Sequence, residues 1–186
     1  MIWEMLCLLV NTYRKNIVLL ATWLAVGLVG IPRVSGTGLD DYVSAPDANY
    51  SYFQQGSPIV GDSYTAYILN MTSQSWRNNT EVNRTLWKHW LIVVKPAVVT
   101  CNTALLHING GNNDNIVPGQ DDILAALAAL ANLTQSIVVD LRMVPNQPLY
   151  FRDESWDAKT EDEILAYSFD KQMVTGDDTW AVLLPM

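Results

Sequence analysis

Aromatic and β-branched residues gather in two segments of the chain, residues 64–71 (YTAYILNM) and 87–94 (WKHWLIVV). Such residues suit the pleated, half-buried surface of a β-sheet, so we expect two strands that pair in antiparallel fashion. The fifteen residues between them exceed the usual hairpin length, and we expect a turn or a short helix there. The preceding stretch, residues 38–58, lacks a steady period and is expected to be extended.

A nearly continuous apolar run at residues 104–108 predicts a strand that is buried on both faces. A helix is expected at residues 121–133 (DDILAALAALANL), and residues 136–141 (SIVVDL) form a second apolar run. This order of strand, helix and strand has the spacing of a βαβ unit, which predicts a parallel pair at the centre of the sheet. The helix positions expected to lie on one face are Ile123, Leu127 and Leu130.

The last third of the chain predicts a strand end and a second helix. Pro145 and Pro148 end the second apolar run, because proline cannot continue a strand ladder. The helix is expected to follow Thr160, whose spacing to Glu163 matches a capping box, and to stop at Gly176. Its apolar face is expected to consist of Leu165, Phe169 and Met173. The predicted fold is therefore α/β, with antiparallel first strands followed by a parallel βαβ unit.

The first 36 residues are typical of a signal peptide rather than of a folded domain. Arg14 and Lys15 precede a mostly apolar run, residues 17–31, and the small residues that end at Gly36 suit cleavage there. The run is short for a transmembrane helix, which needs about 20 apolar residues. The alternatives are an uncleaved signal anchor, which would be the protein's contact with a membrane, and a misread start. We expect a secreted, extracellular protein whose folded part spans residues 37–186.

Charge and composition argue against several classes of ligand. The chain has 11 basic and 19 acidic residues and a net charge of −8. Without the leader, 8 scattered basic and 18 acidic residues remain, so a nucleic-acid partner, which needs a clustered basic surface, is not expected. We find no metal-binding motif and expect neither a metal nor another cofactor. Cys101, the one cysteine outside the leader, is expected to be buried, with an external disulfide partner as the alternative.

Five Asn-x-Ser/Thr sequons agree with export, because this triplet accepts N-linked glycans in secreted proteins. Asn78 and Asn83 lie in a polar stretch and are the strongest candidates, whereas Asn70 lies close to a predicted strand. At each position an ordinary surface asparagine is the alternative. The five glycosylation candidates are Asn49, Asn70, Asn78, Asn83 and Asn132.

The chain contains no serine-hydrolase motif. Such chemistry needs a serine on a Gly-x-Ser-x-Gly turn, a histidine base and an acid. The nearest string, residues 61–65, lacks the second glycine and precedes a strand, so Ser63 is expected to be structural. His89 and His107 each lie inside a predicted strand, where histidine is more often a hydrogen-bonded structural residue than a base. We therefore expect no catalytic residue in this chain.

Several long blocks of residues resemble a single family, the PhoPQ-activated pathogenicity-related proteins. The blocks are residues 39–52 (LDDYVSAPDANYSY), 62–76 (DSYTAYILNMTSQSW), 141–149 (LRMVPNQPL), 161–171 (EDEILAYSFDK) and 175–186 (TGDDTWAVLLPM). The resemblance covers residues 38–186. Members of this family are similar to α/β-hydrolases, are usually exported, and include autocrine proliferation repressors.

In that family the nucleophile region follows the block that ends at Met186. The resemblance implies that residues 37–186 are the N-terminal part of an incomplete α/β-hydrolase-like sheet, truncated before the nucleophile and inactive alone. A complete protein would be a serine hydrolase with a small-molecule or peptide substrate. The alternatives are a non-catalytic secreted signalling protein, which would bind a cell-surface receptor, and an incomplete gene model. Cys101 and His107 depart from the apolar or small residues that the family more often has in this strand.

The resemblance also implies a role for the glycine-rich loop after residues 104–108. In α/β-hydrolases the corresponding loop supplies one backbone N–H to the oxyanion hole, and glycine lets the backbone approach a substrate. A turn that needs glycine only for its geometry is the alternative. The oxyanion-loop candidates are Gly110, Gly111 and Asn112.

Overall fold

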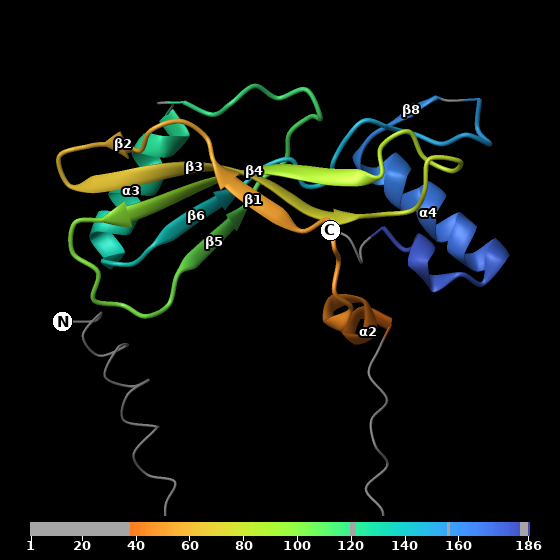
Figure 1. Ribbon diagram of the computed structural model, residues 1–186, viewed down its shortest axis with the longest axis horizontal. Helices are drawn as coiled ribbons and strands as arrows, with labels where there is room; N and C mark the ends of the chain where they lie inside the picture. The colour runs from red at the N-terminus through yellow and green to blue at the C-terminus, as the bar shows by residue number, and fades with distance from the viewer. Residues whose placement is uncertain (1–37, 120–121, 156, 183–185) are drawn as a thin grey trace, which may run out of the picture. The chain divides into compact units, whose positions relative to one another are not determined.

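The computed structural model describes residues 38–119, 122–155, 157–182 and 186 (Figure 1). The predicted signal peptide lies outside these residues. The first half of the chain forms helix α2 (Gly38–Ser44) and strands β1 (Ser51–Gln54), β2 (Ile59–Val60), β3 (Tyr64–Ser75), β4 (Leu86–Pro96) and β5 (Leu105–Ile108). The second half forms α3 (Asp122–Thr134), β6 (Val138–Leu141), β7 (Leu149–Tyr150), β8 (Ala158–Lys159), α4 (Glu161–Thr175) and the 3-10 helix η1 (Asp178–Trp180).

Six strands form one mixed sheet in the order β1-β3-β4-β6-β5, and β2 also pairs with β3. β3 and β4 are antiparallel, as predicted, and are joined by turns rather than by a helix. β5 and β6 are parallel and are connected through α3, which confirms the predicted βαβ unit. The parallel pair lies at one edge of this sheet and not at its centre, because β6 lies between β4 and β5. The fold is therefore α/β, with a mostly antiparallel sheet.

α3 covers one face of the sheet and forms the first of two hydrophobic cores, here called the α3 core (Figure 1). Leu127 is buried and Leu130 is partly buried, as expected, but Ile123 is 40% exposed. The buried face of α3 is displaced by one position because Leu124, which is 1% exposed, faces the sheet. The members of the α3 core are Ala66, Ile68, Trp90, Ile92, Val94, Leu124, Leu127, Ala128, Ala131, Val138 and Met143.

The prediction that residues 104–108 are buried on both faces is wrong. All four residues of β5 are exposed, and the exposed fractions of Leu106 and Ile108 are 56% and 58%. β5 is the last strand in the sheet order and pairs with β6 on one side. A strand at an edge has fewer neighbours, so its apolar side chains are less covered than those of an inner strand.

The second core, here called the aromatic core, joins the ends of β3 and β4 to α4 and η1. Trp76 is at its centre, with ring centroids 5.9 Å from Trp87, 6.4 Å from Phe151 and 6.0 Å from Trp180, all at nearly perpendicular planes. Edge-to-face packing of this kind is favourable because the positive ring edge meets the negative ring face. The members are Trp76, Val82, Trp87, Leu149, Phe151, Ile164, Tyr167, Trp180 and Val182.

Local signals for the start and end of α4 are confirmed. The Glu163 carboxylate accepts a hydrogen bond from the N–H of Thr160 at 3.1 Å, and Gly176 ends the helix at φ +66°. The predicted apolar face is wrong, since Phe169 and Met173 are 37% and 77% exposed and Leu165 is only partly buried. The aromatic core, rather than the distribution of apolar residues within the helix, decides which face is buried. The buried residues of α4 are Ile164, Tyr167 and Ser168.

The sheet face opposite α3 carries a continuous apolar row, here called the open sheet face. Leu69, Leu91, Leu141 and Ile108 are successive cross-strand partners on β3, β4, β6 and β5, so their side chains lie on the same face. Ile92, the next residue along β4, belongs to the α3 core, which places the row on the other side. The three leucines are half-buried and Ile108 is exposed.

Candidate functional site

The glycine-rich loop after β5 lies beside the chain that leaves β6, at the carboxyl ends of the parallel pair. The N–H of Met143 donates to the carbonyl of Gly110 at 3.0 Å. Gly111 has a φ of +139°, and an added Cβ would lie 2.6 Å from Nδ2 of Asn115, so this position requires glycine. The N–H of Asn112 donates to Oδ1 of Asn115 at 3.1 Å, which leaves Gly110 and Gly111 as the better oxyanion donors. That role stays a prediction.

His107, on β5, is oriented by a buried carboxylate on β6. Asp140 is 0% exposed and accepts hydrogen bonds from Nδ1 of His107 at 2.6 Å and from Nε of Arg142 at 2.7 Å. The Arg142 guanidinium compensates the carboxylate, because a buried charge without a partner costs several kcal/mol. The His107 side chain is 51% exposed. Because Nδ1 donates this hydrogen bond, it carries the ring proton, and in a neutral His107 ring Nε2 is the basic nitrogen.

Ser73 and His89 form a hydroxyl–imidazole pair that the sequence analysis missed. Oγ of Ser73 lies 3.0 Å from Nε2 of His89, and Nδ1 of His89 lies 3.1 Å from the carbonyl oxygen of Arg142. Because a carbonyl only accepts, Nδ1 carries the proton and Nε2 accepts from the Ser73 hydroxyl. Burial lowers the pKa of His89 and outweighs the opposing hydrogen bonds to the backbone of Arg142 and Met143. The ring is therefore neutral near pH 7.

A β-bulge places Ser73 next to His89. The register of β3 against β4 shifts between Thr72 and Gln74, so Ser73 is the extra residue of the bulge. A bulge breaks the alternation of side chains and can redirect one of them, and bulges are frequent beside active sites. The bulge has no signature in the hydrophobic pattern. The one hint in the sequence is the polar run TSQS at the end of an otherwise apolar strand.

Ser73 also lines a cavity of about 460 Å³ at the end of β3. Tyr42 of α2 donates from its hydroxyl to Oε1 of Gln74 at 2.5 Å. Asp47 accepts from the N–H of Ser75 at 2.7 Å, and this backbone hydrogen bond is the main reason that the pKa of Asp47 lies below its usual value. The lining residues are Tyr42, Val43, Ala45, Pro46, Asp47, Tyr50, Ser73, Gln74 and Ser75.

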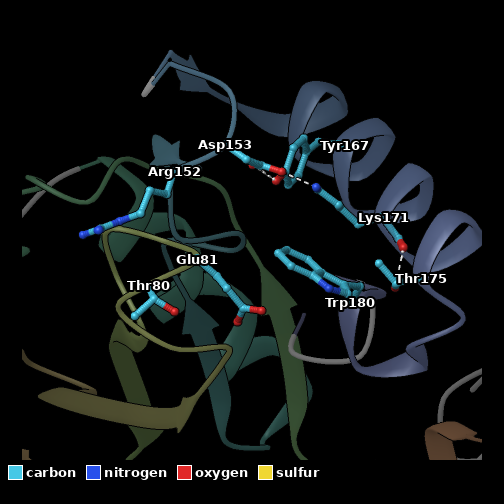
Figure 2. A pocket seen from close by; sticks show the side chains of 8 residues that line it. All are labelled: Thr80, Glu81, Arg152, Asp153, Tyr167, Lys171, Thr175 and Trp180. Carbon is cyan, nitrogen blue, oxygen red and sulfur yellow. Dashed lines mark hydrogen bonds and ion pairs between the residues drawn. The ribbon is translucent and has the colours of Figure 1, made fainter.

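A second cavity, of about 360 Å³, lies beside α4 at the edge of the aromatic core (Figure 2). The Tyr167 hydroxyl donates to Asp153 at 2.5 Å, and the Lys171 ammonium forms an ion pair with the same carboxylate. Burial, together with the contact to Asp153, raises the pKa of Tyr167. Lys171 is thus already paired within the protein. The lining residues are Thr80, Glu81, Arg152, Asp153, Tyr167, Lys171, Thr175 and Trp180.

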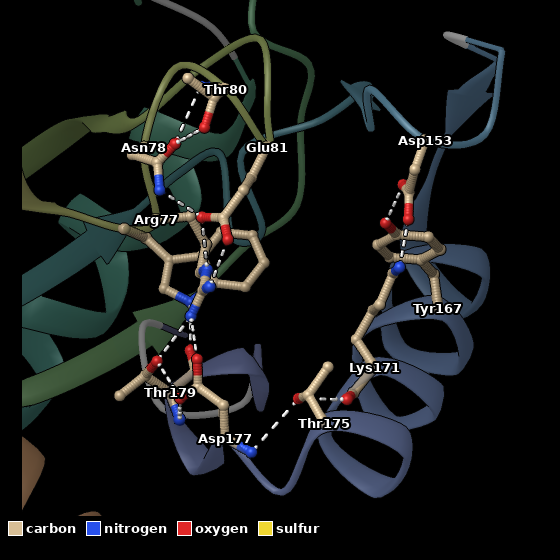
Figure 3. Close-up of polar contacts among 11 residues, drawn as sticks. Arg77, Asn78, Thr80, Glu81, Asp153, Tyr167, Lys171, Thr175, Asp177 and Thr179 are labelled. Carbon is tan, nitrogen blue, oxygen red and sulfur yellow. Dashed lines mark hydrogen bonds and ion pairs between the residues drawn. The ribbon is translucent and has the colours of Figure 1, made fainter.

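Arg77 ties the connection between β3 and β4 to the segment after α4 (Figure 3). Its guanidinium lies 4.0 Å from the ring centroid of Trp180 and pairs with Glu81 at 2.7 Å and with Asp177 at 3.0 Å. Hydrogen bonds from Thr179 and from Arg77 lower the pKa of Asp177. Because these charges are mutually paired, we interpret the network as support for the aromatic core.

The sequon asparagines differ in their surroundings. Asn70 is half-buried inside β3, between partners on β1 and β4. Asn132 is half-buried on α3 and donates from Nδ2 to Oγ of Ser63 at 2.8 Å, which gives Ser63 a structural contact. The asparagines of the other three sequons are exposed, which leaves more room for a glycan. They are Asn49, Asn78 and Asn83.

Cys101 is half-buried and precedes β5, so it is less buried than expected. Among the residues that the structure describes, no three His, Cys, Asp or Glu side chains gather in a way that could hold a metal ion. None of the helices in this described part of the chain has the length and apolar character that a membrane span requires.

Comparison with known proteins gives a match over most of the chain. The sequence model of the PhoPQ-activated pathogenicity-related protein family matches residues 39–186. The chain is similar to autocrine proliferation repressor protein A of Dictyostelium discoideum, with 35% identity over 159 residues, which is 84% of this chain. The chain spans 31% of the length of that relative. No solved structure matches the chain.

Proposed function

Because the chain belongs to the PhoPQ-activated pathogenicity-related protein family, we propose that it is the N-terminal part of a secreted, glycosylated, α/β-hydrolase-like protein. The observation that carries this proposal is the crossover from β5 through α3 to β6, with Gly110 and Gly111 at the carboxyl ends of the two strands. α/β-hydrolases draw an oxyanion-hole N–H from the loop between the corresponding strand and helix. The whole protein would hydrolyse an acyl or peptide bond in a small molecule or peptide.

The exposed apolar surface of the sheet supports a longer protein. The open sheet face and the exposed edge of β5 are the surfaces on which further helices and strands of an α/β sheet would be placed. The chain spans 31% of the length of the Dictyostelium relative, which agrees with a longer protein. In the proposal the nucleophile turn belongs to the polypeptide that follows residue 186, and this chain alone does not turn over an ester substrate.

A serine-directed fluorophosphonate tests the hydrolase proposal on the longer polypeptide. We expect labelling at a serine beyond residue 186, located by mass spectrometry. Gly110→Pro removes one candidate oxyanion donor and should lower kcat by about 10²–10³. Gly110→Ala keeps the N–H, and its Cβ would meet nothing within 4 Å, so it should retain activity. The absence of a labelled serine beyond residue 186 would contradict the proposal.

Export and glycosylation are tested together in a eukaryotic expression host. We propose that the leader directs export and that the exposed asparagines Asn78 and Asn83 carry glycans. The secreted chain should lose mass on treatment with a glycan-releasing amidase, and the double variant Asn78→Gln/Asn83→Gln should lose most of that change. Asn70→Gln is the matched control, because Asn70 is half-buried inside β3. A protein retained inside the cell, or one without a change in mass, would contradict this part.

A non-catalytic extracellular repressor of proliferation is the second candidate function. The specific observation is the name of the relative, which describes it as an autocrine repressor of proliferation. In this case the open sheet face and the exposed edge of β5 would bind a cell-surface receptor. The complete protein, added to cells in culture, should slow their growth, and Gly110→Pro should leave this effect unchanged. Loss of the effect together with loss of fluorophosphonate labelling would instead favour the enzyme.

A further inference from the structure

We propose that Ser73 is an acyl-acceptor site, activated by His89, that forms an ester with small apolar acyl groups supplied by activated carboxylic esters. Three observations meet at this position. The hydroxyl and the imidazole are within hydrogen-bond distance, the β-bulge redirects the serine, and the serine lines a cavity. A nucleophile, a base within reach and a third group that orients the base are the recurring parts of an activated serine.

The hydrogen bonds around the pair fix the direction of proton transfer. Oγ of Ser73 lies 3.0 Å from Nε2 of His89 but 3.5 Å from the carbonyl oxygen of Trp87, so the imidazole is the better acceptor. The carbonyl of Arg142 holds the Nδ1 proton at 3.1 Å and so keeps the basic nitrogen at Nε2. Because burial lowers the pKa of His89, this nitrogen is unprotonated near pH 7 and ready to accept a proton.

The acylation step balances with an ester as the co-reactant. As Oγ of Ser73 forms a bond to the acyl carbon, His89 Nε2 takes the hydroxyl proton. The bond between the acyl carbon and the leaving oxygen then breaks, and His89 returns the proton to that oxygen. The products are acyl-Ser73 and an alcohol or phenol, and the histidine is neutral again.

The cavity sets the class of acyl donor and predicts slow deacylation. Its wall includes Val43, Ala45 and Pro46, which suit a short apolar acyl group, and its one carboxylate, Asp47, disfavours an anionic donor. The N–H of Ser75 already donates to Asp47 at 2.7 Å, so this nearby backbone group is not free to stabilise an oxyanion. Without this donor both acylation and deacylation are slowed, because both steps pass through a tetrahedral oxyanion. The acyl-serine should still accumulate, because an activated ester has a better leaving group than the serine alkoxide, and this is compatible with a chain that does not turn over substrate.

The test uses p-nitrophenyl butyrate with the purified chain. We expect a burst of about one equivalent of p-nitrophenol per chain, and mass spectrometry should place the butyryl group on Ser73. Ser73→Ala should abolish the burst, and His89→Gln should slow it by about 10²-fold or more. The matched control is Ser57→Ala, which changes an exposed serine outside the lining of the cavity and should leave the burst unchanged.

Two further measurements keep the result decisive. Far-UV circular dichroism checks that Ser73→Ala and His89→Gln fold like the parent. If either variant does not fold, the substitute test compares two cysteine variants. Ser73→Cys should then react faster with iodoacetamide than Ser75→Cys, because only position 73 lies beside His89. No burst from the folded parent, acylation at another residue, or equal rates in parent and His89→Gln would overturn the proposal. Since the proposed hydrolase nucleophile lies beyond residue 186, the position of the label separates the failure of one proposal from that of the other.

Discussion

The α3 core and the aromatic core stabilise opposite ends of the long β3–β4 pair in different ways. The α3 core is largely aliphatic and combines residues of the long strands β3 and β4 with residues of α3 and β6. The aromatic core brings Trp76 against Phe151 and Trp180, which lie 75 and 104 positions later in the sequence. Charged residues border both cores: Arg77 lies over Trp180 of the second core, and Asp140 is the cross-strand partner of Ile92 in the first. The first core is thus built mainly by continuous segments, and the second by residues from several short ones.

Because the two cores are built differently, we expect the two ends of the β3–β4 pair to respond differently to mutation. The aliphatic contacts of the α3 core are non-directional and tolerate small shifts of their neighbours. The edge-to-face contacts of the aromatic core depend on ring orientation, and each contributes about 0.5–1.5 kcal/mol beyond its buried area. One ring, Trp76, makes three of them. A loss at the centre of the aromatic core should therefore disconnect α4 from the sheet.

The largest effect is expected from Trp76→Ala. The side chain is 2% exposed, and its Nε1 donates to the carbonyl of Thr179 at 3.0 Å. The substitution therefore removes the three ring contacts and this hydrogen bond. We expect the free energy of unfolding to fall by about 3–5 kcal/mol in a urea titration. Trp76→Phe keeps part of the ring and should lose less. Equal losses in the two variants would show that the ring contacts do not decide the stability of this end.

A somewhat smaller effect is expected from Leu124→Ala in the α3 core. Leu124 is 1% exposed on α3, and its truncation leaves a cavity against the sheet. We expect a loss of about 2–4 kcal/mol in the same titration, with no loss of the native signal from α4 at low urea. Ile123→Ala is the matched control, because Ile123 is 40% exposed and should cost well under half as much. A larger loss at Ile123 than at Leu124 would contradict the packing of α3 described above.

The sequence predicts the features of the fold that depend on neighbouring residues better than those that depend on distant ones. The strands β3, β4 and β6, the helix α3 and the start and end of α4 were predicted, because continuous apolar runs, capping residues and glycine act within a few positions. The buried face of α3 was predicted in part, since Leu127 and Leu130 are covered as expected, whereas that of α4 was not predicted correctly. Ile123 and Met173 are apolar but exposed, since distant residues determine which side of each helix is covered.

The candidate sites show a similar limit. The position of Gly110 and Gly111 after a strand could be read from the sequence, because glycine beside an apolar run marks a loop. The pairing of Ser73 with His89 could not, because it depends on a bulge and on the register of two strands. The contact between His107 and Asp140 likewise required knowing that β5 and β6 are neighbours in register.

An intermediate effect is expected from Arg77→Met at the border of the aromatic core. The change keeps an apolar chain of similar length but removes the charge over Trp180 and leaves Glu81 and Asp177 without this partner. Both carboxylates are partly exposed, so water compensates much of the loss. We expect a decrease of about 1–2 kcal/mol in the free energy of unfolding, with Arg77→Lys in between. An unchanged stability in Arg77→Met would show that the guanidinium contributes only through its aliphatic stem.

The smallest effect is expected from acid, and it should separate the two cores without any mutation. The pKa of Asp177 is lowered by Thr179 and Arg77, and that of Asp153 by Lys171 and Tyr167 against the opposing effect of burial. A carboxylate with a lowered folded-state pKa stabilises the fold above its unfolded pKa of about 4 and loses that contribution as pH falls through the folded value.

We therefore expect a small decrease of the urea midpoint between pH 7 and 5, because the lowered pKa of His89 lets the unfolded chain bind a proton that the folded chain does not. A further decrease should follow below about pH 4, where these carboxylates are protonated. Hydrogen exchange should show that α4 opens before α3 over this range, because the paired carboxylates border the aromatic core. Asp47→Asn controls for the third carboxylate with a lowered pKa, which lies at the other cavity. Arg77→Met should show a smaller pH dependence than the parent, because one partner of Asp177 is already absent. Simultaneous opening of α3 and α4 in acid would show that the two cores unfold as one unit.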